Sequence, residues 1–254
     1  MKRTFLLLLS GLLWVSCERK TAADVYDKPY HDVYRQDPAE NDSTLKANNT
    51  ELTLRPLRVI FTGHPQYALL PMLKVRYYVD GTPYTNDIEY NELSYRNEND
   101  YEELRNKADY YNMHNNIVAG FEAIYGDDLM NISITNNTTG ERKMLFEQPV
   151  RIKNFYYPSP LTDVLANKPI TRQYYMVSCY DEDTNKDGYI NRDDLRRFYL
   201  FSLDGKPVRA LIEKNYGVVG SDYDYVNDLL FVYAYLDSNN NGKIDAKDPK
   251  HIFR

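Results

Sequence analysis

Two stretches of the sequence place oxygen-bearing side chains at the spacing with which a single loop wraps a hard cation. The first loop runs over residues 183–194 and the second over residues 237–248. Both fill the first, third, fifth, ninth and twelfth positions with Asp or Asn, and the seventh position can contribute its backbone carbonyl, the donor pattern of a calcium loop. The expected ligands are Asp183, Asn185, Asp187, Tyr189, Asn191 and Asp194 in the first loop, and Asp237, Asn239, Asn241, Lys243, Asp245 and Asp248 in the second. The sequence therefore predicts two Ca²⁺ sites.

Other positions of the loops support this interpretation. Gly188 and Gly242 stand at the sixth position, where a sharp turn disfavours a Cβ atom. Ile190 is expected to fasten the first loop to a core. Each loop offers three carboxylates and closes with Asp instead of the longer Glu, which predicts a dissociation constant on the order of 10⁻⁵ to 10⁻³ M. Structural calcium is the main expectation and a calcium switch the secondary one. The alternative is that these Asp- and Asn-rich runs are ordinary solvated turns.

The loop sequences resemble the calcium loops of EF-hands and, because Asp closes them, those of dockerins. The segments before them, residues 176–180 and 230–236, are rich in β-forming residues. Strand-led loops of this kind are similar to the cation loops between propeller strands in integrin-like repeats. The resemblance implies calcium binding through the ligand positions named above, with strands leading into the loops.

The strands expected around the loops form an internal repeat. The first unit has strands at 129–134 and 141–146 joined by a turn at 136–140, then a strand at 174–180 that leads into the first loop. The second unit has strands at 198–203 and 208–212, then a strand at 229–236 that leads into the second loop. Residues 161–171 of the first unit are expected to be an irregular excursion. The hairpin-strand unit resembles a blade of a β-propeller, and such repetition predicts an array of supersecondary units.

The region before the repeat, residues 51–115, is also expected to be β-rich. Residues 52–61 and 69–79 have strand composition. Residues 99–112 show apolar residues at helical spacing after a capping-box pattern, which predicts one short helix. The fold class expected is therefore mainly β, with antiparallel blade-like repeats over 116–254, two calcium loops and one short helix.

The N-terminal residues have the pattern of a targeting sequence. Lys2 and Arg3 precede an apolar run over 5–15 that is too short to span a bilayer, which is typical of a signal peptide over 1–16. The sequence Ser16-Cys17 then resembles the lipobox of bacterial lipoproteins, which implies lipidation of Cys17 and a place in the bacterial cell envelope, on the outer membrane. A plain secretory signal that leaves Cys17 free is the alternative.

The segment after the signal, within 17–50, is polar and poor in aliphatic residues, so it is expected to be a disordered tether. The net charge of −6 argues against nucleic acid as a partner. The chain has 2 cysteines, and if Cys17 carries lipid then Cys179 has no partner for a disulfide. We expect Cys179 to be a buried, unreactive thiol.

No grouping in the sequence predicts catalysis. The 4 histidines are scattered, and nucleotide-binding and nucleophile-elbow motifs are absent. The predicted function is therefore that of a non-catalytic, calcium-binding, membrane-anchored envelope lipoprotein that acts as a structural or protein-interaction module. The alternative is a cell-surface glycan-binding lipoprotein, suggested by the 25 tyrosines, whose rings can stack on sugars but also suit strands.

Overall fold

The structure is a computed structural model that describes residues 45–47, 52–75, 118–125 and 128–254. The expected signal peptide, Cys17, most of the expected tether and the predicted helix over 99–112 lie outside these residues. Within the described residues, the regular secondary structure consists of β-strands only, and all paired strands are antiparallel. The expectation of a mainly β, antiparallel fold is confirmed.

The strands, in chain order, are β1 (Leu45–Lys46), β2 (Leu54–Pro56), β3 (Ile60–Phe61), β4 (Tyr67–Lys74), β5 (Phe121–Tyr125), β6 (Leu129–Asn136), β7 (Arg142–Met144), β8 (Arg151–Pro158), β9 (Asp163–Leu165), β10 (Lys168–Ile170), β11 (Tyr174–Tyr180), β12 (Tyr189–Ile190), β13 (Arg197–Ser202), β14 (Pro207–Ala210), β15 (Tyr216–Asp224), β16 (Leu229–Leu236) and β17 (Lys250–Phe253).

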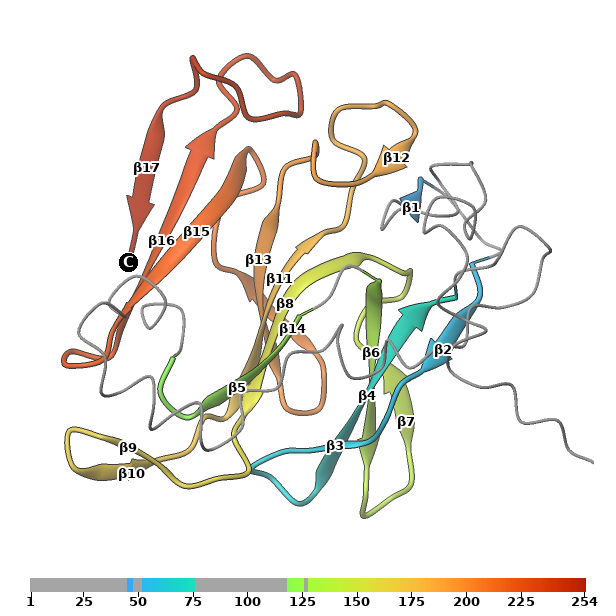
Figure 1. The fold of residues 1–254 in the computed structure, drawn as a ribbon, viewed down its shortest axis with the longest axis vertical. Helices are drawn as coiled ribbons and strands as arrows, with labels where there is room; N and C mark the ends of the chain where they lie inside the picture. The colour runs from blue at the N-terminus through green and yellow to red at the C-terminus, as the bar shows by residue number, and fades with distance from the viewer. Residues whose placement is uncertain (1–44, 48–51, 76–117, 126–127) are drawn as a thin grey trace, which may run out of the picture.

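Most of these strands belong to three sheets that lie side by side (Figure 1). The first sheet has the order β2-β4-β6-β7, with β3 also paired to β4. The central sheet has the order β14-β13-β11-β8-β5, and the outer sheet is the meander β15-β16-β17. The pairs β9–β10 and β1–β12 stand apart as two-stranded ribbons.

The central sheet packs on both faces, as the alternation of side chains along β11 shows. Tyr175, Val177 and Cys179 enter the core shared with the first sheet, whereas Met176 enters the core shared with the outer sheet. Successive side chains of a strand point to opposite faces, so a strand buried on both sides must be apolar almost throughout. This explains why β11 reads as a continuous run of apolar residues, with only Ser178 interrupting it.

The repeat has a clear structural form, because each unit begins in one sheet and ends in the next. The hairpin β6–β7 lies in the first sheet and is followed by β8 and β11 of the central sheet. The hairpin β13–β14 lies in the central sheet and is followed by β15 and β16 of the outer sheet. Strands β8 and β15 occupy equivalent places as the antiparallel neighbours of β11 and β16, where the sequence predicts only connecting stretches.

Two expectations about local structure need correction. Residues 161–171 are not irregular, because β9 and β10 form a hairpin whose turn residues Ala166 and Asn167 have positive φ angles of 50° and 61°. Residues 52–61 are not one strand either. Strands β2 and β3 both pair with β4 but are separated by residues 57–59, and the backbone N–H of Leu57 after Pro56 donates to the carbonyl of Pro71 at 2.9 Å.

Candidate functional site

Each of the predicted cation loops joins two neighbouring antiparallel strands. Residues 183–194, called loop 1 below, connect β11 to β13 in the central sheet. Residues 237–248, called loop 2, connect β16 to β17 in the outer sheet. Both lie at the same end of the molecule, at the top of Figure 1.

The first half of loop 1 is folded around its ligand-position side chains. The carboxylate of Asp183 accepts hydrogen bonds from the backbone N–H groups of Asp187 at 3.1 Å and Gly188 at 2.9 Å. The side-chain oxygen of Asn185 accepts from Asp187 N–H at 2.9 Å, and that of Asp187 from Tyr189 N–H at 3.0 Å. These oxygens therefore all accept from backbone N–H groups of residues 187–189, the turn at the middle of the loop.

The second half of loop 1 is closed by Asp194, which is 3% exposed. One of its oxygens accepts from Thr184 N–H at 2.8 Å, and the other accepts from Asn191 N–H at 2.8 Å. Asn191 in turn accepts from Asp193 N–H at 2.7 Å. The last ligand position thus ties the beginning of the loop to its end.

Loop 2 repeats the first half of this network position by position. Asp237 accepts from the N–H groups of Asn241 at 3.1 Å and Gly242 at 2.9 Å. Asn239 accepts from Asn241 N–H at 3.1 Å, and Asn241 accepts from Lys243 N–H at 2.8 Å. The first, third and fifth positions of the two loops therefore accept from equivalent backbone N–H groups. Loop 2 adds two hydrogen bonds that loop 1 lacks, because the side-chain amides of Asn239 and Asn241 donate to Asp245 at 2.8 and 3.4 Å.

The closing half is also repeated in loop 2. Asp248 accepts from Ser238 N–H at 3.1 Å with one oxygen and from Asp245 N–H at 2.9 Å with the other. Asp245 accepts from Lys247 N–H at 2.8 Å, as Asn191 does from Asp193.

The backbone shows the same equivalence. The fourth position of each loop is left-handed, with φ of 62° at Lys186 and 55° at Asn240. The sixth position is left-handed as well, with φ of 92° at Gly188 and 74° at Gly242. Side chains other than Gly, Asn and Asp rarely adopt this region, so Lys186 is held there by the loop around it.

The two loops touch each other, a contact that no spacing in the sequence predicts. The Thr184 hydroxyl of loop 1 donates to the Gly242 carbonyl of loop 2 at 2.6 Å and accepts from Leu195 N–H at 2.9 Å. A Cβ atom built on Gly242 would stand 1.9 Å from the Thr184 carbonyl oxygen. The glycine at this position is therefore required by the neighbouring loop as well as by its own backbone.

The apolar eighth position is buried differently in the two loops. Ile190 is 8% exposed, lies in β12 and pairs with Leu45 of β1, and the Ala47 N–H donates to the Gly188 carbonyl at 2.9 Å. Ile244 is 37% exposed and contacts Gly217 of β15. The expectation that Ile190 fastens loop 1 to the fold agrees with this burial, although its partner comes from the N-terminal segment.

The donor atoms of both loops are chemically suited to a hard cation. The side-chain oxygens and carbonyls at the ligand positions are of the kind that Ca²⁺ takes. Burial raises the pKa of Asp194 against the opposing effect of its hydrogen bonds, whereas the hydrogen bond from Asp245 N–H lowers the pKa of the equivalent Asp248. In the described part of the chain no three His, Cys, Asp or Glu side chains gather closely enough to hold a metal ion. The loop carboxylates accept from backbone amides and would have to turn toward a bound ion.

The remaining residues singled out in the sequence lie apart from the loops or outside the described residues. Cys179 is fully buried in β11, and burial raises the pKa of its thiol well above the ordinary value, which suits an unreactive cysteine. His64 lies near the start of β4 and His251 in β17, where His251 packs against Tyr216 and Phe253. Within the described residues, no helix is long and apolar enough to cross a membrane.

Comparisons with known proteins found no matching family model, no matching curated protein and no matching solved structure.

Proposed function

We propose that this chain is a calcium-binding, membrane-anchored envelope lipoprotein whose folded part is a non-catalytic structural or protein-interaction module. The observation that carries the calcium proposal is the equivalence of the two loops, which share hydrogen bonds and left-handed positions although they belong to different sheets. Ordinary solvated turns have no reason to agree in this way at their ligand positions and at their fourth and sixth residues.

A structural role for the ions is supported by where the loops lie. Each loop joins two adjacent strands of one sheet, and the loops meet through Thr184 and Gly242. Ions bound there would hold together the central and outer sheets at one end of the molecule. Cys179 is buried, so within the described residues no disulfide performs this task.

Calorimetry of the full chain with Ca²⁺ tests the proposal. A ligand that binds only the folded state at about 100 times its dissociation constant stabilises it by about 2.7 kcal/mol per site. We expect heat for two ions and a higher melting temperature in Ca²⁺ than in chelator. Equal melting temperatures under the two conditions would overturn the proposal.

Variants assign the effect to each loop. The double substitution Asp183→Asn with Asp187→Asn should remove one site, and Asp237→Asn with Asp245→Asn the other. Asp193→Asn is the matched control, because Asp193 is exposed in loop 1 at a position that supplies no ligand. Losing the loop 1 site should also accelerate labelling of Cys179 by a thiol reagent, since β11 leads directly into that loop. A stability loss in the control equal to that of the double variants would attribute the effect to general charge removal.

The lipid anchor is tested through Cys17. Cys17→Ala should release the protein from the membrane fraction, whereas Cys179→Ala should not. Trp14 is the sole tryptophan, so a mature chain that begins at Cys17 should show tyrosine fluorescence alone. Membrane retention of Cys17→Ala, or tryptophan emission from the purified mature protein, would contradict the proposed processing.

A further inference from the structure

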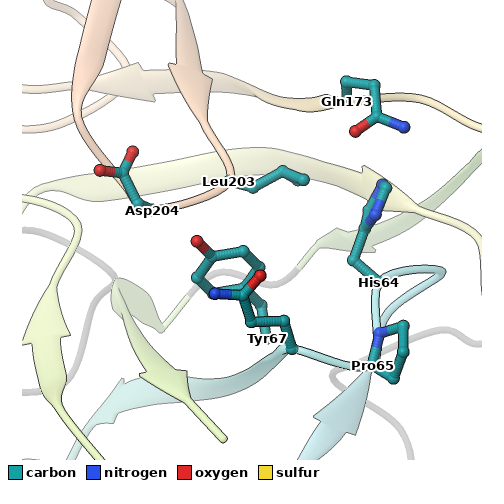
Figure 2. Close-up of a pocket in the computed structure, with 7 residues that line it drawn as sticks. His64, Pro65, Tyr67, Gln173, Leu203 and Asp204 are labelled. Atoms are coloured by element: carbon teal, nitrogen blue, oxygen red, sulfur yellow. The ribbon is translucent and has the colours of Figure 1, made fainter. Parts of the chain in front are cut away.

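A polar pocket lies between the first and central sheets, away from the cation loops. Its volume is about 560 Å³, within the range of small-ligand sites. It is lined by the turn before β4, the residue before β11 and the turn after β13, and the lining residues are His64, Pro65, Gln66, Tyr67, Gln173, Leu203 and Asp204. Figure 2 shows Tyr67 and Leu203 between Asp204 at one end and His64 with Gln173 at the other.

The wall that precedes β4 is fixed in place by hydrogen bonds. The Thr62 hydroxyl accepts from His64 N–H at 3.1 Å, and the His64 imidazole Nε2 lies 2.7 Å from the carbonyl oxygen of Arg172. Asn137 binds the same wall through the carbonyls of Pro65 and Gln66, at 2.9 and 2.8 Å. A ligand would therefore meet a preformed surface, which lowers the ordering cost of binding.

The opposite wall is fixed as well. Asp204 accepts from the Ser202 hydroxyl at 2.5 Å and from the Lys206 ammonium at 2.7 Å. These two hydrogen bonds lower the pKa of Asp204 to about 2, so it is ionised at neutral pH. Gly205 in the same turn packs so closely that a Cβ atom would stand 2.7 Å from Ile134 Cδ1.

The lining groups have unused hydrogen-bonding capacity. The amides of Gln66 and Gln173 are exposed and form no side-chain hydrogen bond within the described residues. The Tyr175 hydroxyl is buried and also lacks a partner among these residues. Burial raises the pKa of Tyr175, and Tyr67 and Asp204 raise it further, although Tyr175 itself is not among the residues that line the pocket.

We propose that this pocket binds a neutral carbohydrate. The side-chain amides and the Asp204 carboxylate of the pocket can hydrogen-bond the vicinal hydroxyls of a sugar. The half-buried ring of Tyr67 can pack against the apolar face of a sugar ring. An anionic ligand would meet the ionised Asp204, and a cationic one would compete with Lys206 for it. The lining is too polar to favour an aliphatic ligand.

This site is independent of the calcium loops. Gln173 immediately precedes β11, whereas loop 1 follows the end of the same strand. The seven residues of β11 separate the two sites by roughly 20 Å along an extended strand. Sugar binding is therefore expected to survive the loop variants described above as long as the fold persists, and its failure would leave the calcium proposal untouched.

The test uses the full chain in a detergent that has no sugar headgroup, screened against immobilised neutral oligosaccharides (glucans, mannans, xylans) and acidic ones (polygalacturonate, heparin). We expect selective binding within the neutral group. Gln66→Ala and Gln173→Ala should each weaken it about tenfold, the loss of roughly one hydrogen bond to a polar ligand. Gln148→Ala is the matched control, because Gln148 is exposed and does not line the pocket.

Tyr67→Phe keeps the ring and should retain most of the binding, whereas Tyr67→Leu should lose at least tenfold. Melting temperatures show whether each variant is folded. If Tyr67→Leu unfolds, the two glutamine variants still decide the test, because their side chains are exposed and their loss should not unfold the protein. Absence of binding to every neutral oligosaccharide, stronger binding to the acidic ones, or equal binding by the glutamine variants and the control would each overturn the proposal.

Discussion

Loop 1 and loop 2 share most of their internal hydrogen bonds but have different surroundings. Gly188 of loop 1 is exposed, and a Cβ atom there would meet nothing within 4 Å. Gly242 of loop 2 is buried against the backbone of Thr184. Loop 1 instead receives the N-terminal strand β1 along its eighth position. Equivalent residues in a repeat can thus have one role inside their own loop and quite different roles toward the rest of the molecule.

The largest expected difference between the loops comes from their glycines. Gly242→Ala would force the loops apart, because the methyl group would overlap the Thr184 carbonyl, and we expect a loss on the order of 4 kcal/mol or more in the free energy of unfolding. Gly188→Ala should cost only the strain of a left-handed residue, about 1–2 kcal/mol. Urea unfolding of both variants measures the difference. Equal losses would show that the loops do not pack as described.

The eighth positions should differ next. Ile190→Ala removes a buried side chain and should cost about 2–5 kcal/mol. Ile244→Ala removes a partly exposed one and should cost about 1 kcal/mol or less. Thermal unfolding in chelator isolates this packing effect from any bound ion. If Ile244→Ala proved the more damaging change, the contact of Ile244 with Gly217 would outweigh the pairing of Ile190 with Leu45.

The second positions should show the smallest difference. Thr184→Ala leaves the buried Leu195 N–H and the Gly242 carbonyl without their partner and should cost about 1–3 kcal/mol. Ser238→Ala removes one part-buried hydrogen bond from the exposed Ser238 to Asp248 and should cost about 0.5–1.5 kcal/mol. Thr184→Ser retains the hydroxyl and serves as the control. A double-mutant cycle between Thr184→Ala and a loop 2 ligand variant, read by calorimetric Ca²⁺ affinity, should reveal coupling between the sites.

The sequence predicted most of the loop-bearing half and less of what lies around it. Strands β6, β11, β13 and β16 are apolar runs with sharp turn residues beside them, so local composition was sufficient. Strand β15 contains Gly217, Gly220 and Asp222, which are poor strand formers, and only its pairing with β16 holds it extended. The β9–β10 turn uses Ala166 and Asn167 in place of the usual Asn-Gly, which concealed that hairpin.

The candidate sites divide in the same way. The cation loops are local in sequence, so their ligand spacing was visible directly. The contact of Thr184 with Gly242 and the polar pocket join segments that are distant along the chain, and no local pattern signals either of them.

The short pairing of β1 with β12 also determines which contacts would break first if the chain were pulled from its N-terminal side. Leu45 and Lys46 attach to loop 1, and the chain enters the first sheet only later, at β2. Tension applied to the N-terminal side of Leu45 would therefore load the Ala47–Gly188 hydrogen bond and the β12 pairing before it reached any core strand. These few contacts would break first, which would lengthen the segment that precedes the first sheet while the sheets remained intact. Stiffening loop 1 with a bound ion would raise the force at which this happens.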